Sequence, residues 1–450
     1  MRLAFLKFGL IAAALLAPAA GAMAWQLRPE WQGPCREAAV IDVNLGNSPE
    51  AFVRAACCQV TGKEPSPALV AYWAARMRGD PRLRRVDVVR TLCMQSGRTR
   101  YALSYSDPWV GDQEPPAPLA PCARTGKRDV GAVVMFFFHC PGGVNCGMDW
   151  AGTHAYGMQT PSPLLAWRGK PGLYTPSNPG FWARVLTDAA RAGLQFILPN
   201  AYGPDIQEGG VKTLAQALGQ VGDGVKVGLF DDTSAWGQKW FGPYWQAAPD
   251  LSQPAYAARK LYESKWKPFF SQVPRPDWYL VDGRPLIYFY NANTLLPLAD
   301  SAGVLLIMKQ MFKNDFGVKP FVVVDKAFFQ DPRMPRVADS QFVWDTFSLP
   351  GGVSRFTRDG RTFCNAMVKW DSVGRDHPGA LPAASDRMVL GPDLLEKVLA
   401  GTRDADVLVL ATWNDLGEGT GIDRNYDYYS LGRWLAPDTF MNVVRQAQCR

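Results

Sequence analysis

The chain has 450 residues, of which 47% are hydrophobic and 20% charged, so it has enough apolar material for a large core and is not a disordered chain. It carries 48 basic and 41 acidic residues, a formal net charge of +7. Beyond the N-terminal segment no run approaches the roughly 18 apolar residues of a membrane span. We expect neither a membrane span nor a nucleic-acid partner.

The first 24 residues have the features of a secretory signal peptide. Arg2 and Lys7 are basic, residues 8–16 are apolar, and Ala22-Met23-Ala24 has the small-x-small form of a cleavage site. We expect cleavage after Ala24 and a secreted, periplasmic or cell-envelope protein. An uncleaved membrane anchor is the alternative.

All nine cysteines follow this segment. In an oxidising compartment most of them should pair, and the odd number leaves at least one unpaired or intermolecular. Their spacing does not give the connectivity, although Cys140 and Cys146 could close one short loop and Cys449 is placed to tie down the C-terminal tail. A zinc site is the alternative, but the chain has no CxxC and only three histidines, so we expect no metal and no cofactor.

Residues 25–127 are expected to form a small, mainly helical module stapled by disulfides. Ser48-Pro49 and Ser66-Pro67 each pair an N-cap residue with a first-turn proline and so predict two helices. The Pro-rich run 114–121 is typical of a linker. The module has 14 basic and 10 acidic residues, and six of its arginines cluster: Arg76, Arg78, Arg82, Arg84, Arg85 and Arg90. A solvated helix face explains this cluster, and contact with an anionic surface is the alternative.

Residues 128–450 alternate apolar strands with amphipathic helices. We predict strands at 131–138, 194–198, 225–230, 285–290, 321–324, 341–344, 366–370 and 407–411. Helices are predicted at 179–192, 211–218, 256–270, 302–312, 393–399 and 431–446. Eight strands with helices between most of them predict an α/β fold, a (β/α)8 TIM barrel, rather than an open doubly wound sheet.

At the ends of the predicted strands, acid or amide side chains repeatedly stand next to aromatic ones. Aromatic rings stack on the apolar faces of pyranose rings, and carboxylates and amides bind hydroxyl groups, so this recurrence predicts a sugar site at the carboxyl ends of the strands. A single such pair is weak evidence, because an Asp after a strand also caps the following helix. The candidate substrate-binding residues are His139, Trp150, Asn200, Tyr202, Asp231, Asp232, Tyr290, Asp345, Trp370, Asp371, Trp413, Asn414 and Thr420.

Asp415 and Glu418 are the candidate catalytic residues. Glycoside hydrolysis generally uses two carboxyl groups, one as proton donor and one as base or nucleophile. Three residues apart on a regular strand, these two would point to opposite faces. They converge only if the chain leaves the strand at Asp415, which Gly417 and Gly419 favour. The alternative is that Asp415 caps a turn and Glu418 forms a salt bridge.

Other chemistries have little support. The patterns GxGxxG, GxxxxGK[ST], HExxH and GxSxG are absent, and three histidines leave little material for a Ser-His-Asp triad. Asp423, Asn425 and Asp427 have the spacing of a calcium loop, but Tyr428 stands where that loop requires glycine.

The segment from Trp413 to Thr420, Trp-Asn-Asp-Leu-Gly-Glu-Gly-Thr, resembles the Trp-Asn-Glu-Trp-x-Glu-Gly-Thr segment of glycoside hydrolase family 99, the endo-α-mannosidases. It also resembles the Trp-Asn-Asp-Tyr-Gly-Glu-Ser segment of family 71, the α-1,3-glucanases. Domains of unknown function in the same barrel group carry the blended form seen here. The similarity extends loosely back to Val130, and residues 25–127 lie outside it.

The resemblance implies a (β/α)8 barrel in which Glu418 is the general acid/base and Asp415 the second carboxylate. It places Asp231 or Asp232 near a substrate-binding glutamate of family 99. Asp415 replaces a glutamate and Leu416 an aromatic residue of family 99, so the sugar and the stereochemical outcome stay open.

The sequence thus predicts a secreted glycoside hydrolase that cleaves an α-linked polysaccharide. Its expected parts are a signal peptide (1–24), the helical module with its linker (25–127) and the barrel (128–450). Two alternatives remain: a non-catalytic glycan-binding protein on the same barrel, and a structural envelope protein whose working part is the Arg-rich module.

Overall fold

The computed structural model describes residues 26–27, 29–80, 83, 85–104, 109–110, 122, 124, 126–136, 159–161, 176–201, 210–221, 224–233, 253–290, 300–347, 349–368, 370–371, 387–388, 392–415, 420–429 and 433–449. Several predictions concern residues outside these ranges: the signal peptide, the Pro-rich linker, His139, Cys140, Cys146, Trp150, Tyr202 and Glu418.

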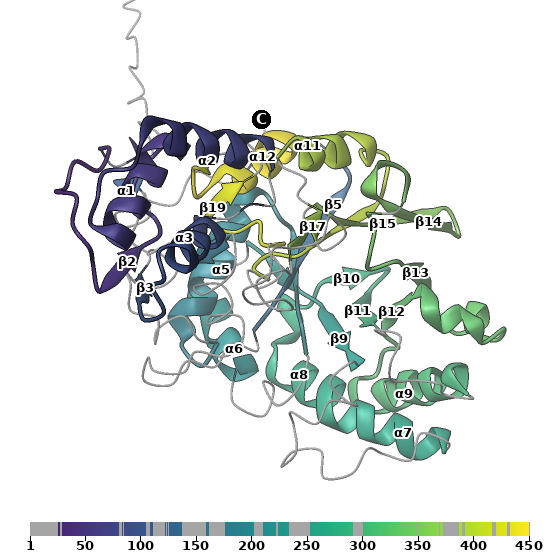
Figure 1. Ribbon diagram of the computed structural model, residues 1–450. Coiled ribbons are helices and arrows are strands. Elements are labelled where there is room, and N and C mark those ends of the chain that lie inside the picture. The colour runs from purple at the N-terminus through teal and green to yellow at the C-terminus, as the bar shows by residue number, and fades with distance from the viewer. Residues whose placement is uncertain are drawn as a thin grey trace, which may run out of the picture.

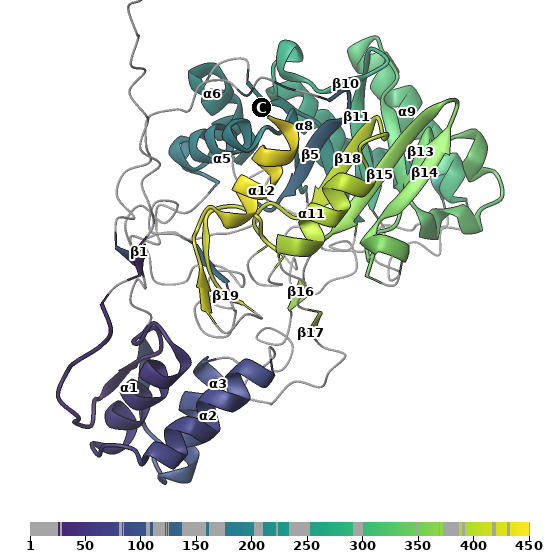
Figure 2. The same ribbon diagram turned by 90° about the horizontal axis from the view of Figure 1, so that it is seen from above.

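The first part of the described chain is a three-helix unit with its own core. It contains β1 (Gln26–Leu27), β2 (Val40–Asp42), α1 (Pro49–Thr61), α2 (Pro67–Gly79), α3 (Arg85–Gln95), β3 (Ala102–Ser104) and β4 (Trp109–Val110). Ser48 and Ser66 cap α1 and α2 as predicted, because each side chain accepts a backbone N–H bond from the first helical turn. Its buried apolar residues form a cluster separate from the larger core, and Figure 2 shows α1–α3 to one side of the larger unit.

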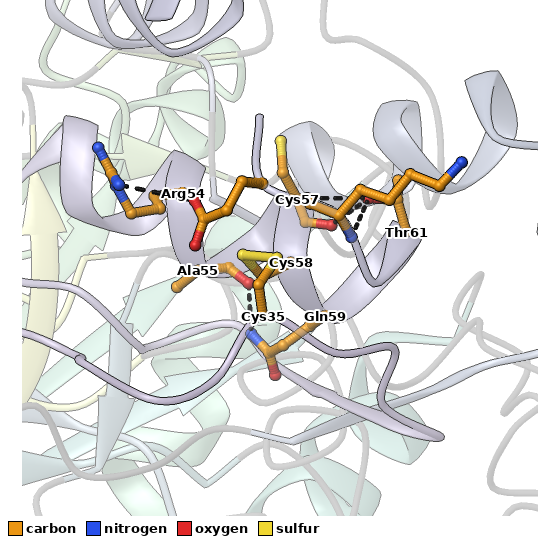
Figure 3. The surroundings of a disulfide bond; sticks show 9 residues. Cys35, Arg54, Ala55, Cys57, Cys58, Gln59 and Thr61 are labelled. Atoms are coloured by element: carbon orange, nitrogen blue, oxygen red, sulfur yellow. Dashed lines mark hydrogen bonds and ion pairs between the residues drawn. A yellow bond between two sulfur atoms is a disulfide. The ribbon is translucent and has the colours of Figure 1, made fainter. Parts of the chain in front are cut away.

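Two disulfides join four of the seven described cysteines, and Cys57, Cys93 and Cys364 are buried free thiols. Cys35–Cys58 links the segment before α1 to the last turn of that helix (Figure 3). Cys122–Cys449 spans 327 residues of sequence and confirms that Cys449 ties down the tail. Cys57 lies buried beside the first disulfide with a free thiol, and burial raises its pKa to about 11, which keeps the thiol neutral and unreactive.

All eight strands predicted for the larger unit are present, with their ends shifted by a few residues. They are β5 (Asp129–Val134), β7 (Phe196–Pro199), a third strand in two pieces, β8 (Lys226–Val227) and β9 (Leu229–Asp232), β11 (Arg284–Tyr290), β12 (Phe321–Asp325), β13 (Ser340–Phe342), β15 (Arg361–Met367) and β18 (Val407–Ala411). Pairing is parallel from β15 through β18, β5 and β7 to β8, and from β9 through β11 and β12 to β13.

Gly228 lies between the two pieces of the third strand. A Cβ atom at this position would lie 2.6 Å from Cδ2 of Leu198 and 2.9 Å from the carbonyl oxygen of Leu286. Only glycine fits between the Leu198 side chain and the β11 backbone at this distance. Parallel pairing with the second strand resumes beyond it, at a bridge between Asn200 and Phe230. The two runs of pairing are therefore parts of one parallel layer.

Among the described residues this layer does not close into a complete barrel. β15 pairs antiparallel with β14 (Ser354–Arg358), a hairpin that the sequence did not predict, and forms no ladder with β13. Side-chain hydrogen bonds cross the junction instead: Asn365 Nδ2 donates to the carbonyl of Val343 (2.9 Å), and the N–H of Met367 donates to Thr346 Oγ1 (2.9 Å). The predicted strand order is present, whereas the predicted closure is not observed at this junction.

Helices surround the strand layer (Figures 1 and 2). They are α5 (Pro179–Ala192), α6 (Gly210–Val221), α7 (Pro254–Leu261) running through the π-helical η6 (Tyr262–Trp266) into α8 (Lys267–Gln272), α9 (Ser301–Phe316), α11 (Pro392–Gly401) and α12 (Thr439–Gln448). The signals at both ends of α5 are confirmed: Asn178 caps its start, and Gly193 ends it in a left-handed conformation. The helix predicted from residue 431 begins only at Thr439, because the chain first forms strand β20 (Arg433–Leu435).

The remaining described elements are short. They are β6 (Gln159–Pro161), η7 (Arg275–Asp277), β10 (Leu280–Val281), η8 (Lys326–Gln330), η9 (Met334–Arg336), η10 (Pro350–Gly352), β16 (Trp370–Asp371), β17 (Arg387–Met388) and β19 (Asn425–Tyr429). None of the helices in the described ranges combines the length and the apolar character of a bilayer span.

Side chains along the strands alternate between the inside of the layer and the helices outside it. Phe230, Tyr288 and Phe342 come from three different strands, yet their rings meet, with centroids 6.4 Å (Phe230–Tyr288) and 4.9 Å (Tyr288–Phe342) apart. Phe289, one residue further along β11, packs instead on Trp266 of η6 and on Phe328 of η8. Since successive residues point to opposite faces, this fixes which strand residues face inward.

Candidate active site

The chain leaves β18, the last strand of the parallel layer, before it reaches Asp415. β18 ends at Ala411, and residues 412–415 follow in an irregular segment. This is the break that the odd spacing of Asp415 and Glu418 requires. Asp415 is buried, with 4% of its surface exposed. Glu418 lies outside the described residues, so its place beside Asp415 stays a prediction.

Two threonines clamp the ends of the segment that carries the candidate catalytic residues. The N–H of Asp415 donates to Thr412 Oγ1 (2.8 Å), and the hydroxyl groups of Thr412 and Thr420 share a hydrogen bond (2.7 Å). The N–H of Thr420 also donates to the carbonyl of Asp415 (3.0 Å). The chain therefore returns at Thr420 to the point at which it left, so Thr420 supports the loop rather than offering its hydroxyl group to a substrate.

Asn414 anchors the same segment to the end of β5. Its side-chain oxygen accepts the N–H of Met135 (2.7 Å), and its Nδ2 donates to the carbonyl of Met135 (3.0 Å). Asn200 lies beside this pair, with its Nδ2 3.1 Å from the sulfur of Met135. Trp413 is buried in the core with 1% of its surface exposed. We therefore assign Trp413 and Asn414, both predicted as substrate-binding, to holding the loop.

The segment after Thr420 is fixed by backbone hydrogen bonds and by a buried ion pair. The N–H groups of Ile422 and Asp423 both donate to the carbonyl of Trp413 (2.8 and 2.9 Å). Arg424 then lies 3.1 Å from a carboxylate oxygen of Asp188 on α5, and both side chains are at least 95% buried. The loop after β18 is thus held against a helix of the outer layer as well as against β5.

Asp231 and Asp232 are adjacent, but they face opposite sides of the strand layer. Asp231 faces the helices: its two carboxylate oxygens accept bonds from Lys265 Nζ (2.9 Å) and Trp266 Nε1 (2.7 Å), in a fully buried ion pair. Asp232 pairs in register with Tyr290 and shares the inward face with Phe230. Both were predicted to bind substrate; Asp231 holds the π-helix η6 instead, and Asp232 faces the candidate site.

Aromatic rings line the inward face below these strand ends. Phe230, Tyr290 and Trp344 are in mutual contact, with centroids 5.6, 5.0 and 5.2 Å apart for Phe230–Tyr290, Phe230–Trp344 and Tyr290–Trp344. Tyr290 and Trp344 are each half-buried. We call Tyr290 and Trp344 the aromatic floor; the sequence predicted Tyr290 as substrate-binding and did not select Trp344.

Asp325 is a further inward-facing carboxyl group that the sequence analysis did not select. It ends β12, pairs in register with Phe342 of β13, and is 92% buried. Its Oδ1 accepts the N–H of Ala327 (2.8 Å). Burial raises the pKa of Asp325 to about 6, and the bond from Ala327 opposes this shift only in part.

For three other predicted site residues, Asp345, Trp370 and Asp371, the structure shows only local backbone contacts. Asp345 is exposed, and its carboxylate accepts the N–H of Phe347 (3.1 Å) in a turn. Trp370 and Asp371 form β16, whose backbone pairs antiparallel with Met388 and Arg387.

Within the described ranges one cluster has the spacing of metal ligands, formed by Cys35, Cys58 and Glu64. The two cysteines are joined in a disulfide, so their sulfur atoms are not available as thiolate ligands in this state.

One family model matches this chain. The family model for "Domain of unknown function (DUF5010)" matches residues 150–448, more than half of the chain. The chain therefore belongs to this family. No curated protein matches it in sequence.

Several solved structures that resemble the fold are glycoside hydrolases. A GH99 endo-α-mannosidase from Bacteroides thetaiotaomicron is 12% identical, with a TM-score of 0.49 over 72% of this chain and 97% of the other. A glycoside hydrolase-like protein is 11% identical, with a TM-score of 0.44 over 74% and 97%. A GH138 enzyme targeting pectin rhamnogalacturonan II is 10% identical, with a TM-score of 0.38 over 81% and 43%.

Proposed function

We propose that this protein is an exported glycoside hydrolase that cleaves an α-linked polysaccharide, with Glu418 as general acid/base and Asp415 as the second carboxyl group. The observation that carries the proposal is the clamped break after β18. A buried acid stands there in a loop whose two ends are fixed to each other and to β5. Catalytic carboxyl groups need such rigid support, because small displacements cost much of the rate.

Chain connectivity favours Glu418 as the partner of Asp415. Glu418 is two residues before Thr420, and Thr420 is hydrogen-bonded to Asp415. The odd spacing that would separate the two carboxylates on a strand does not apply here, because the strand has ended. Hydrolysis would then need carboxyl groups roughly 5 to 10 Å apart, with the smaller separation for a retaining and the larger for an inverting mechanism.

The aromatic floor supports a carbohydrate as substrate. The half-buried Tyr290 and Trp344 can stack on the apolar face of a pyranose ring, and Asp232 faces the same interior to bind hydroxyl groups. The two disulfides fit export to an oxidising compartment.

The test is a hydrolysis screen with α-linked polysaccharides, including α-mannans and α-1,3-glucans, with the product anomer read by NMR. Glu418→Gln should reduce the rate of hydrolysis by 10²-fold or more while the protein stays folded. Binding of a polysaccharide without any hydrolysis would instead support the glycan-binding alternative.

A further inference from the structure

We propose that Asp325 is a further substrate-contacting residue of this site, and that its carboxyl group hydrogen-bonds a sugar hydroxyl group beside the aromatic floor. The proposal rests on the proposed carbohydrate site but not on hydrolysis. Asp325 follows the predicted strand 321–324, but it was not among the predicted site residues.

The register of the strands places Asp325 at the inner edge of the layer. Phe321 and Val323 of the same strand face inward, as shown by the stacking of Phe321 on Phe363 and the pairing of Val323 with Tyr288. Asp325 follows at the same alternation and pairs with Phe342. Neighbouring strands lie about 4.8 Å apart, so Asp325 and Asp232, two strands away across Tyr290, flank the aromatic floor with backbones roughly 10 Å apart.

Buried hydroxyl groups lie on the same inward face, one layer deeper. Tyr288 and Ser340 both pair in register with Val323. Their oxygen atoms are buried and have no hydrogen-bond partner among the described residues. Buried polar atoms are rarely left unpaired unless a ligand or water serves them. The inward face of the strand layer below Asp325 therefore carries polar groups as well as apolar ones.

No described cation neutralises Asp325. The titratable or charged groups on the elements packed against it are Arg284, Tyr288 and Tyr290 on β11 and Lys326 on η8, and β13 carries none. Arg284 stands at the opposite end of its strand and pairs with Asp339. None of these groups offsets the cost of burying the charge, which leaves Asp325 able to hold a proton in mildly acidic solution.

A protonated carboxyl group donates a hydrogen bond that a carboxylate cannot. If Asp325 donates to a sugar hydroxyl group, binding is stronger below pH 6 than above it. The simplest structural role, capping the turn at Ala327 through Oδ1, predicts no such dependence. An amide at this position keeps the cap and donates at every pH, so Asp325→Asn separates the two roles.

The experiment is calorimetric titration of the full-length protein with S-linked α-1,3-gluco- and α-manno-oligosaccharides, which resist hydrolysis, at pH 5 and pH 7.5. Wild type should bind at least one of them about tenfold more weakly at pH 7.5, which corresponds to roughly one hydrogen bond. Asp325→Asn should bind equally at both pH values, and Asp325→Ala should bind weakly at both. Asp300→Asn is the matched control, because Asp300 also caps a helix through its carboxylate, at the start of α9.

Three results would overturn the proposal: no binding by wild type at pH 5, an Asp325→Asn variant that keeps the pH dependence of wild type, or an Asp325→Ala variant that binds as wild type does. If wild type hydrolyses a polysaccharide and the Asp325 variants bind oligosaccharides as wild type does, the proposed hydrolase stands and Asp325 is not part of its site. If binding depends on Asp325 and wild type hydrolyses nothing, Asp325 contacts the sugar and the proposed hydrolase activity is wrong.

Discussion

Asp231 and Asp232 show how one step along a strand changes the role of a carboxylate. Sequence analysis could place both after an apolar strand but could not choose between them, because the face depends on register with the neighbouring strands. Lys265 and Trp266, which hold Asp231, lie more than 30 residues away in sequence. Asp325 was overlooked for a related reason: an Asp after a strand is typical of a helix cap, and only burial distinguishes it.

The buried ion pair of Asp231 and Lys265 should matter for stability. Lys265→Met would leave Asp231 charged and unpaired in a fully buried site, which costs about 3–5 kcal/mol of unfolding free energy. Lys267→Met is the control two residues on, because Lys267 is half exposed and its pair with Asp315 contributes at most about 1 kcal/mol. Urea denaturation of both variants measures the difference, and equal losses would argue against a structural role for Asp231.

The raised pKa of Asp325 also predicts how stability changes with pH. The unfolded carboxyl group ionises near pH 4 and the folded one near pH 6, so between these values the folded state binds the extra proton. The contribution of Asp325 to stability therefore falls as pH rises from 4 to 6. Relative to Asp325→Asn, wild type should lose on the order of 2–3 kcal/mol between pH 4 and pH 7.

Urea titrations of the two proteins at a series of pH values measure this difference. The Asn variant carries every other titrating group, so those contributions cancel in the comparison. Parallel pH curves would mean that Asp325 ionises normally in the folded protein.

At the scale of elements, local signals predicted most of what was found. α5 has its cap, its proline and its terminal glycine within one segment, and its bounds follow from them. What local signals do not encode is how distant elements meet. The open junction between β13 and β15 is bridged by Asn365 and Thr346, whose partners lie about 20 residues away, and the hairpin of β14 occupies the edge. Clamping of the last loop by Thr412 and Thr420 was likewise not predicted.

The threonine clamp should couple loop geometry to activity. Thr412→Val keeps the shape of the side chain but leaves the N–H of Asp415 without its acceptor, at a cost of about 1–3 kcal/mol. We expect kcat to fall at least tenfold as the carboxylate loses its fixed position. Thr357→Val is the matched control, because Thr357 and Thr362 share a similar hydroxyl pair on the β14–β15 hairpin. A rate loss of the same size in the control would refute a specific role for the clamp.

For the whole molecule, Cys122–Cys449 is the longest covalent link in the described chain. It fastens the end of α12 to the segment that leads into β5, next to Gly193 at the end of α5. Cross-links that close long loops stabilise by about 2–5 kcal/mol. Cys449→Ala should therefore lower the apparent melting temperature of the larger unit by several degrees.

Differential scanning calorimetry tests this, with Cys35→Ala as the comparison. The Cys35–Cys58 disulfide lies within the three-helix unit, whose core is separate, so its loss should spare the melting transition of the larger unit. An unchanged melting temperature in Cys449→Ala would show that α12 is held by packing alone.

We propose that the broken end of β18 carries the catalytic pair, Glu418 and Asp415. The most direct measurement is the rate of polysaccharide hydrolysis by wild type, Glu418→Gln and Asp415→Asn, on the α-linked substrate that wild type cleaves best and with folding checked by circular dichroism. Each substitution should reduce kcat by 10²-fold or more in a folded protein. A folded Glu418→Gln variant with the wild-type rate would contradict this proposal.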